Sequence, residues 1–135
     1  MSPPASFDTI ADALVAWAID EERIRGLWIE GAAPGDVRRP YSRLEAHLAA
    51  EEPSFQGLLE AAALFLERDL GAEVLRASDA VRFAKEFAAR LESLSFTLIL
   101  ERTPFLAKRP RAEVTALLDR SGHLTHVMDF SKRKR

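Results

Sequence analysis

Apolar residues recur three and four positions apart in three stretches of the chain, which is the spacing of one face of an α-helix. These stretches cover residues 7–20, 53–70 and 78–91. Each has a polar residue near its start that suits the N-cap of a helix, and Gly71 suits the end of the second. The candidate N-caps are Ser6 or Asp8, Ser54, and Ser78 or Asp79. The pattern therefore predicts three helices.

Shorter apolar segments, rich in β-branched and aromatic residues, are typical of strands. We expect strands at residues 24–31, 43–49, 96–100, 112–118 and 123–130. Because residues 119–122 form too short a connection for a crossover, the last two strands are expected to be antiparallel neighbours. The order of elements predicts an α+β fold, with helices packed on one face of a small mixed or antiparallel sheet.

Residues alternate in character along the second expected strand. Leu44, Ala46 and Leu48 share one face, and Arg43, Glu45 and His47 share the other. The polar face is either a candidate site or an ordinary solvated surface, on which an ion pair contributes little stability. Two tryptophans, Trp17 and Trp28, lie within apolar patterns and are expected in the core.

The chain has 135 residues, the size of a single domain, which we place at residues 1–130, followed by a basic tail at residues 131–135. Apolar residues are 47% of the chain and charged residues 30%, the balance of a globular protein. The net charge is −2, and the last four residues carry four positive charges, so the rest of the chain carries −6. This acidic body argues against a dedicated nucleic-acid binder.

Cysteine is absent, which excludes disulfides, thiolate nucleophiles and zinc–thiolate sites. No apolar run approaches the length needed to span a bilayer, so no membrane partner is expected. The first residues lack the basic start and apolar core of a signal peptide. These features predict a cytoplasmic protein.

One combination of turn and strand carries candidate chemistry. The first expected strand ends in Gly31-Ala32, a turn with Gly35 follows, and Ser42 precedes Arg43-Leu44-Glu45 on the next strand. This arrangement resembles the nucleotidyltransferase fold of the DNA polymerase β superfamily. That family carries Gly-Ser, about a dozen residues, an acid–hydrophobic–acid triplet, and a third acid on a later strand. Asp129 is the candidate for the third acid.

The resemblance implies a site in which paired carboxylates hold Mg²⁺ against a nucleoside triphosphate. Glu45 and Asp129 are the remaining candidate catalytic acids and metal ligands. The candidate nucleotide- or phosphate-binding residues are Gly31, Ala32, Gly35, Ser42 and Arg43. Two departures weaken catalysis, since Arg43 replaces the first acid and repels a metal, and Ala32 lacks the hydroxyl of serine. We expect Arg43 to pair with Glu45, while direct contact of Arg43 with a phosphate stays open.

Three functional hypotheses follow. The first is a catalytically degenerate nucleotidyltransferase-like protein that acts as an interaction or regulatory scaffold. The resemblance implies that such small members often work beside a helical partner, in some cases as an antitoxin. The second is an active enzyme using Mg²⁺ and a nucleoside triphosphate, with Glu45, Asp129 and one further acid, such as Glu30 or Glu101. The third is a homodimeric structural domain paired through exposed edge strands.

Overall fold

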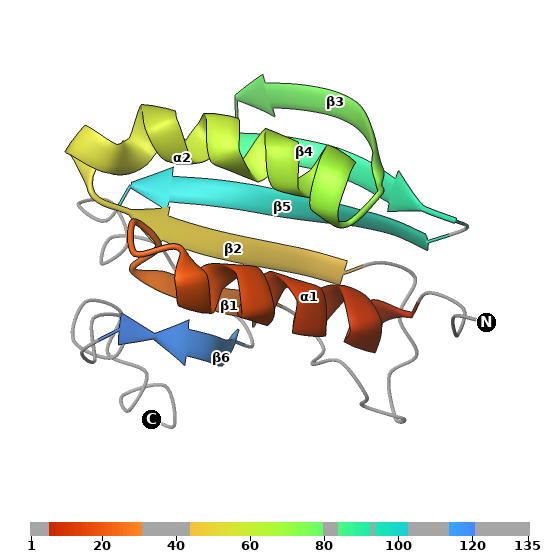
Figure 1. Ribbon diagram of the computed structural model, residues 1–135, viewed down its shortest axis with the longest axis horizontal. Helices are drawn as coiled ribbons and strands as arrows, with labels where there is room; N and C mark the ends of the chain where they lie inside the picture. The colour runs from red at the N-terminus through yellow and green to blue at the C-terminus, as the bar shows by residue number, and fades with distance from the viewer. Residues whose placement is uncertain (1–5, 31–43, 80–83, 93, 103–113, 121–135) are drawn as a thin grey trace.

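The computed structural model describes residues 6–30, 44–79, 84–92, 94–102 and 114–120. Within them the chain forms two α-helices, a short π-helix and six strands (Figure 1). In chain order these are α1 (Phe7–Asp20), β1 (Gly26–Glu30), β2 (Leu44–Ala50), α2 (Glu52–Leu64), the π-helix η1 (Phe65–Asp69), β3 (Glu73–Asp79), β4 (Lys85–Leu91), β5 (Leu94–Arg102) and β6 (Val114–Asp119).

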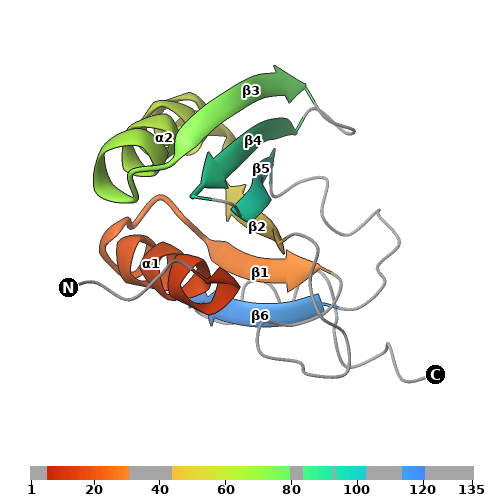
Figure 2. The ribbon, with the colours of Figure 1, turned by 90° about the vertical axis from the view of Figure 1, so that its right-hand side faces the viewer.

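The six strands form one mixed sheet in the order β3-β4-β5-β2-β1-β6. The central strands β2 and β5 are parallel, and every other neighbouring pair is antiparallel. Both helices lie on the same face of this sheet (Figures 1 and 2). The predicted α+β class with helices on one face is therefore confirmed.

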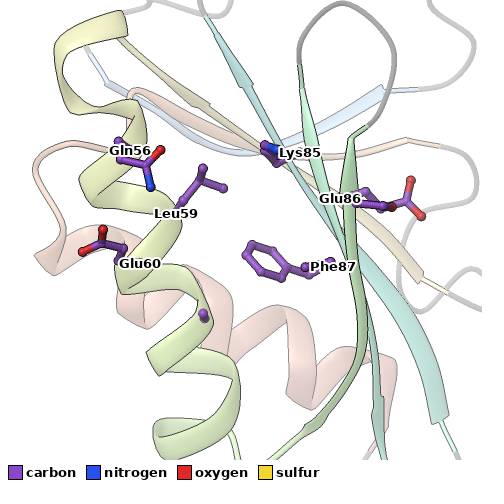
Figure 3. Close-up of a pocket in the computed structure, with 9 residues that line it drawn as sticks. Gln56, Leu59, Glu60, Lys85, Glu86 and Phe87 are labelled. Atoms are coloured by element: carbon purple, nitrogen blue, oxygen red, sulfur yellow. The ribbon is translucent and has the colours of Figure 1, made fainter.

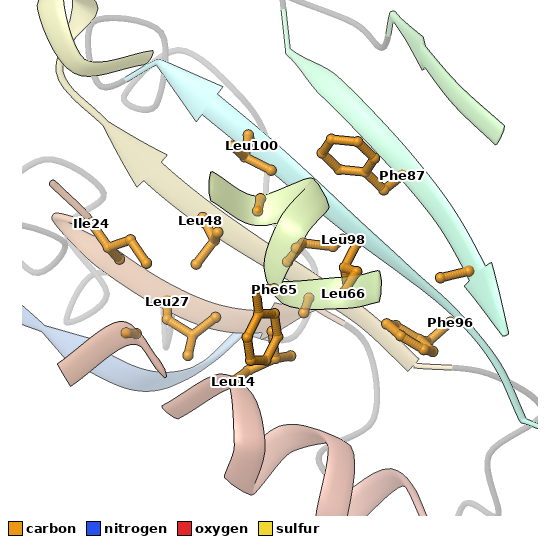
Figure 4. Packing of buried hydrophobic residues seen from close by; sticks show 14 of the residues in the cluster. Leu14, Ile24, Leu27, Leu48, Phe65, Leu66, Phe87, Phe96, Leu98 and Leu100 are labelled. Carbon is orange, nitrogen blue, oxygen red and sulfur yellow. The ribbon is translucent and has the colours of Figure 1, made fainter. Parts of the chain in front are cut away.

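The core lies between the two helices and the sheet (Figure 4). Strands β1, β2 and β5 present every second residue to it, as the alternation of a strand requires. The fully buried large side chains of these strands in this cluster are Leu27, Ile29, Leu44, Leu48, Phe96, Leu98 and Leu100. The helices contribute residues at helical spacing, including Leu14 from α1 and Leu58 from α2. Trp17 is only partly buried and stacks on Phe65, with ring centroids 4.6 Å apart.

Local signals set the helix ends. Ser6 is the N-cap of α1: its side chain accepts a hydrogen bond from the Thr9 backbone N–H, and its own backbone N–H donates to Thr9 Oγ1. The second helix begins at Glu52, with Pro53 in its first turn, so the prediction of Ser54 as N-cap is wrong. Gly71 ends the helical segment with φ +76°, a conformation that suits glycine, and this predicted end is confirmed.

The predicted helix over residues 78–91 is wrong. Residues 73–79 and 85–91 instead form the antiparallel strands β3 and β4. The apolar spacing in this stretch fits a helix, but Phe87 and Ala89 also alternate, and both are buried against the core. Strand β4 has hydrogen-bonded partners on both sides, so tertiary pairing outweighs the local helical preference. No helix in the described part of the chain is long and apolar enough to cross a membrane.

Candidate functional site

The face of the sheet opposite the helices carries the polar chemistry of the central strands. Along β2, Glu45 and His47 alternate with the core residues Leu44, Ala46 and Leu48 and therefore point to this second face. On the neighbouring strand β5, Thr97 and Glu101 alternate with core residues in the same way. The second face is not solvated at its centre, because His47 is 2% exposed, Thr97 7% and Glu101 6%.

His47 is the centre of this group. Its Nε2 lies 2.7 Å from Oε2 of Glu45, and its Nδ1 lies 2.5 Å from Oε2 of Glu101. Trp28, the cross-strand partner of His47 on β1, is fully buried and stacks on the imidazole. The imidazole is thus held in its plane by two carboxylates and on one face by an indole.

This geometry favours a protonated imidazole. A carboxylate accepts hydrogen bonds, and a neutral histidine has only one N–H to donate. With both ring nitrogens protonated, His47 donates to Glu45 and to Glu101 and places a positive charge between two negative ones. The ring also gains from stacking on Trp28, since an aromatic face attracts a cation.

The carboxylates on β2 and β5 bind opposite sides of the imidazole rather than a common point. Within the described residues, no three His, Cys, Asp or Glu side chains are arranged to hold a metal ion. A divalent cation needs several oxygen ligands at about 2.0–2.6 Å around one centre. The arrangement of Glu45, His47 and Glu101 does not fit this requirement, because the imidazole already bridges the carboxylates.

Thr97 lies beside this group, paired in register with Glu45 across the parallel strands. Its Oγ1 is buried, and no hydrogen-bond partner for it is found within the described part of the chain. A buried hydroxyl can donate to or accept from a ligand, but it is a weak metal ligand compared with a carboxylate. Thr97 therefore adds no acid to the group.

The structure describes only part of the predicted site. Glu45 lies on β2 as expected, and its partner among the described residues is His47. Glu101, which the sequence offers as a supplementary acid, lies on β5 next to β2. The other predicted site residues and the expected last strand, 123–130, lie outside the described residues, and so does the expected pairing of Arg43 with Glu45. These site residues are Gly31, Ala32, Gly35, Ser42, Arg43 and Asp129.

Sequence reasoning missed the role of His47. Its alternation with Leu44, Ala46 and Leu48 placed it on the polar face, and the interpretation of that face as solvated is wrong at this position. One face of the His47 ring is covered by Trp28, which the sequence assigned to the core. Trp28 is buried, as expected, but its ring stacks on His47 on the second face of the sheet.

A separate groove lies on the helix-covered side, between α2 and the β3–β4 hairpin (Figure 3). Its volume is about 350 Å³. Leu59 from α2 and Phe87 from β4 point toward one another across it, whereas Glu86 points away (Figure 3). Gln56, Glu60 and Lys85 give the groove a polar rim. Apolar walls with a few polar groups are typical of ligand and partner sites.

Comparison with known proteins identifies no relative of this chain. Neither a scan of protein-family models nor a search of curated proteins finds a match to the chain.

Proposed function

We propose that this protein is a nucleotidyltransferase-like scaffold without transferase chemistry, acting through an interaction or regulatory role. The observation that carries this proposal is the position of His47 between Glu45 and Glu101. In the enzymes that the sequence resembles, carboxylates of neighbouring strands share a metal. Here a cation of the protein itself, the His47 imidazolium, is held by the carboxylates of neighbouring strands.

The arrangement of the central strands supports the same proposal. A helix precedes an antiparallel pair, β1 and β2, and a later strand, β5, lies parallel to β2 with an acid facing the same side as Glu45. The resemblance leads us to expect this order of elements: the second strand carries the paired acids, and a later strand carries the third acid. Glu101 therefore replaces Asp129 as our preferred remnant of the third acid.

Loss of the metal follows from charge. An imidazolium bonded to both carboxylates neutralises part of their charge and leaves little attraction for Mg²⁺. The sequence also has an arginine at position 43, where the family carries its first acid, and a guanidinium does not bind a metal ion. Without Mg²⁺, the charge that develops on a transferred phosphorus has no counter-ion at this position.

Pairing of two copies through the outer strand β3 is unfavourable in the antiparallel register centred on Arg76. Two β3 strands placed antiparallel about Arg76 would bring arginine against arginine and Glu73 against Asp79 of the other copy. Like charges directly opposite one another destabilise a strand pair. The groove between α2 and the β3–β4 hairpin offers a different protein partner an apolar surface.

The test is metal binding by the intact chain, with Mn²⁺ as a spectroscopic substitute for Mg²⁺. Electron paramagnetic resonance reports the fraction of free Mn²⁺ during a titration of the wild type, of Glu45→Gln and of Glu60→Gln. Glu60 is an exposed acid of α2 and serves as the matched control. We expect the three proteins to bind Mn²⁺ equally weakly. A site that Glu45→Gln removes and Glu60→Gln retains would overturn the proposal and favour the active enzyme.

A further inference from the structure

A second cavity lies at the opposite end of β1 from the predicted turn, where the end of α1, the start of β1 and the end of β6 meet. Its volume is about 450 Å³. Among the described residues it is lined by Glu22, Arg25, Leu118 and Arg120. No described member of the Glu45–His47–Glu101 group lines it, so its chemistry is separate from the function proposed above.

Arg25 lines this cavity and carries a guanidinium with an unsatisfied donor. The Nε of its guanidinium is buried, and no hydrogen-bond partner for it is found within the described part of the chain. The backbone at this position is fixed, because Arg25 N–H donates to Ala49 O at 2.8 Å and Arg25 O accepts from Arg120 N–H at 3.2 Å. A buried donor on a charged group without an acceptor is unfavourable, so a neighbouring anion that offsets the charge of this guanidinium would be stabilising.

Arg120 provides a second guanidinium that is already held in place. Its Nε donates to Ile24 O at 2.7 Å, and its Nη2 lies 2.6–3.3 Å from the carbonyl oxygens of Ala18, Ile19 and Glu21. These bonds occupy Nε and Nη2, and none of them uses Nη1. The guanidinium is thereby fixed beside the cavity with donors left over, as an oriented positive charge.

The charges of the lining residues select the ligand. Two guanidinium groups face one carboxylate, Glu22, so the described lining carries a net positive charge. A single water molecule occupies only about 30 Å³, which is far less than the volume of this cavity. Planar guanidinium groups bind phosphate and carboxylate oxygens in pairs. We propose that this cavity binds a small oxyanion, a phosphate or carboxylate group, between the guanidinium groups of Arg25 and Arg120.

The direct test observes the Arg25 donor itself. In a ¹H–¹⁵N spectrum of the arginine Nε–H groups, the Arg25 signal is assigned by its loss in Arg25→Gln. The wild type is then titrated with inorganic phosphate and separately with acetate, with sodium chloride keeping the ionic strength constant. We expect a saturable shift of the Arg25 signal, while the signal of Arg90, an exposed residue paired with Glu73, stays in place. The tighter of the two anions identifies the chemical group that the cavity prefers.

Two variants test the proposal through the affinity of the cavity for the anion. Arg25→Gln should weaken binding by at least about tenfold, since it removes a charge-assisted hydrogen bond. The matched control Arg90→Gln should leave the affinity unchanged. Glu22→Gln should tighten binding about threefold to tenfold, because it removes a negative charge from the lining; it keeps the proposal testable if Arg25→Gln does not fold.

The proposal is wrong if the Arg25 Nε–H signal moves no more with phosphate or acetate than with chloride. It is also wrong if the signal saturates but Arg25→Gln binds the anion as tightly as Arg90→Gln does, or if Glu22→Gln does not tighten binding. None of these results depends on Glu45, so they stay separable from the metal-binding test above.

Discussion

The imidazole of His47 stacks on the indole of Trp28, with ring centroids 5.2 Å apart and ring planes 16° from parallel. The two residues are cross-strand partners in the β1–β2 pair. This contact fixes the orientation of the ring, and the ring in turn presents one nitrogen to Glu45 and the other to Glu101. Trp28 on β1 thereby orients the imidazole that joins the carboxylates of β2 and β5.

We expect His47→Ala to destabilise the protein by about 3–5 kcal/mol, because it removes the imidazole from its buried pair with Glu101. Chemical denaturation at neutral pH measures this loss. The matched comparison is Glu101→Gln in the His47→Ala background, which replaces one of the two carboxylates by a neutral group and should recover part of the lost stability. A loss below about 1 kcal/mol in His47→Ala, the range of exposed ion pairs, would contradict this account.

Arg120 holds the C-terminal end of α1 through its bonds to the carbonyl oxygens of residues 18, 19, 21 and 24. We expect Arg120→Ala to destabilise the protein by about 2–3 kcal/mol, since charge-assisted hydrogen bonds to a helix end are lost. Hydrogen exchange should show faster exchange in the last turn of α1. Arg68→Ala on the exposed side of η1 is the control, and a similar loss there would argue against a specific clamp.

Two glycines should respond to alanine with opposite signs. Gly57 lies within α2, and a Cβ there would meet only the far end of the flexible Arg23 side chain, Nη1 at 2.7 Å. Gly57→Ala should therefore stabilise the protein by about 0.5–1 kcal/mol. Gly71→Ala should destabilise it by about 1–2 kcal/mol, because position 71 has φ +76°. Thermal unfolding of both variants measures the two signs, and a destabilised Gly57→Ala would show that Arg23 cannot move aside.

The ion pair between Glu21 and Arg23 should make the stability of the fold depend on pH. Hydrogen bonds from the Arg23 guanidinium hold the pKa of Glu21 below its ordinary value of 4.5. The lowered pKa means that this pair stabilises the fold above about pH 4.5 and that the contribution is lost as the pH falls through the folded-state pKa. In Arg23→Gln, carboxyl-detected NMR should show the pKa of Glu21 rising toward 4.5. An unchanged pKa would show that Arg23 is not the cause.

The sequence predicted those elements whose apolar spacing fits only one type of secondary structure. The first helix, with Ser6 or Asp8 as its expected cap, and the strands around Trp28, Glu45 and Thr97 follow from local patterns. The β3–β4 hairpin does not, because Phe87 and Ala89 satisfy strand alternation within a stretch that also has helical spacing. Strand β3 is mostly exposed and lies at the sheet edge, so it lacks the apolar alternation that identifies a strand.

The candidate site was predictable only in part, for a similar reason. Glu45 and His47 share a face by alternation alone, and that follows from the sequence. The approach of Glu101, 54 residues from His47, depends on the parallel register of β2 and β5. No local pattern specifies which of several later acids comes next to His47, and the stacking of Trp28 on the second face is likewise a product of sheet pairing.

The most direct measurement of the central claim is thermal unfolding with ATP or GTP, each with and without Mg²⁺, on the wild type and on Glu45→Ala. A ligand at a hundred times its dissociation constant stabilises a protein by about 2.7 kcal/mol, which shifts the unfolding midpoint of a domain this size by several degrees. We predict no stabilisation that depends on Mg²⁺. Stabilisation without metal that disappears in Arg25→Gln would arise from the oxyanion cavity. A Mg²⁺-dependent shift that Glu45→Ala abolishes would contradict the account and identify a working nucleotidyltransferase site.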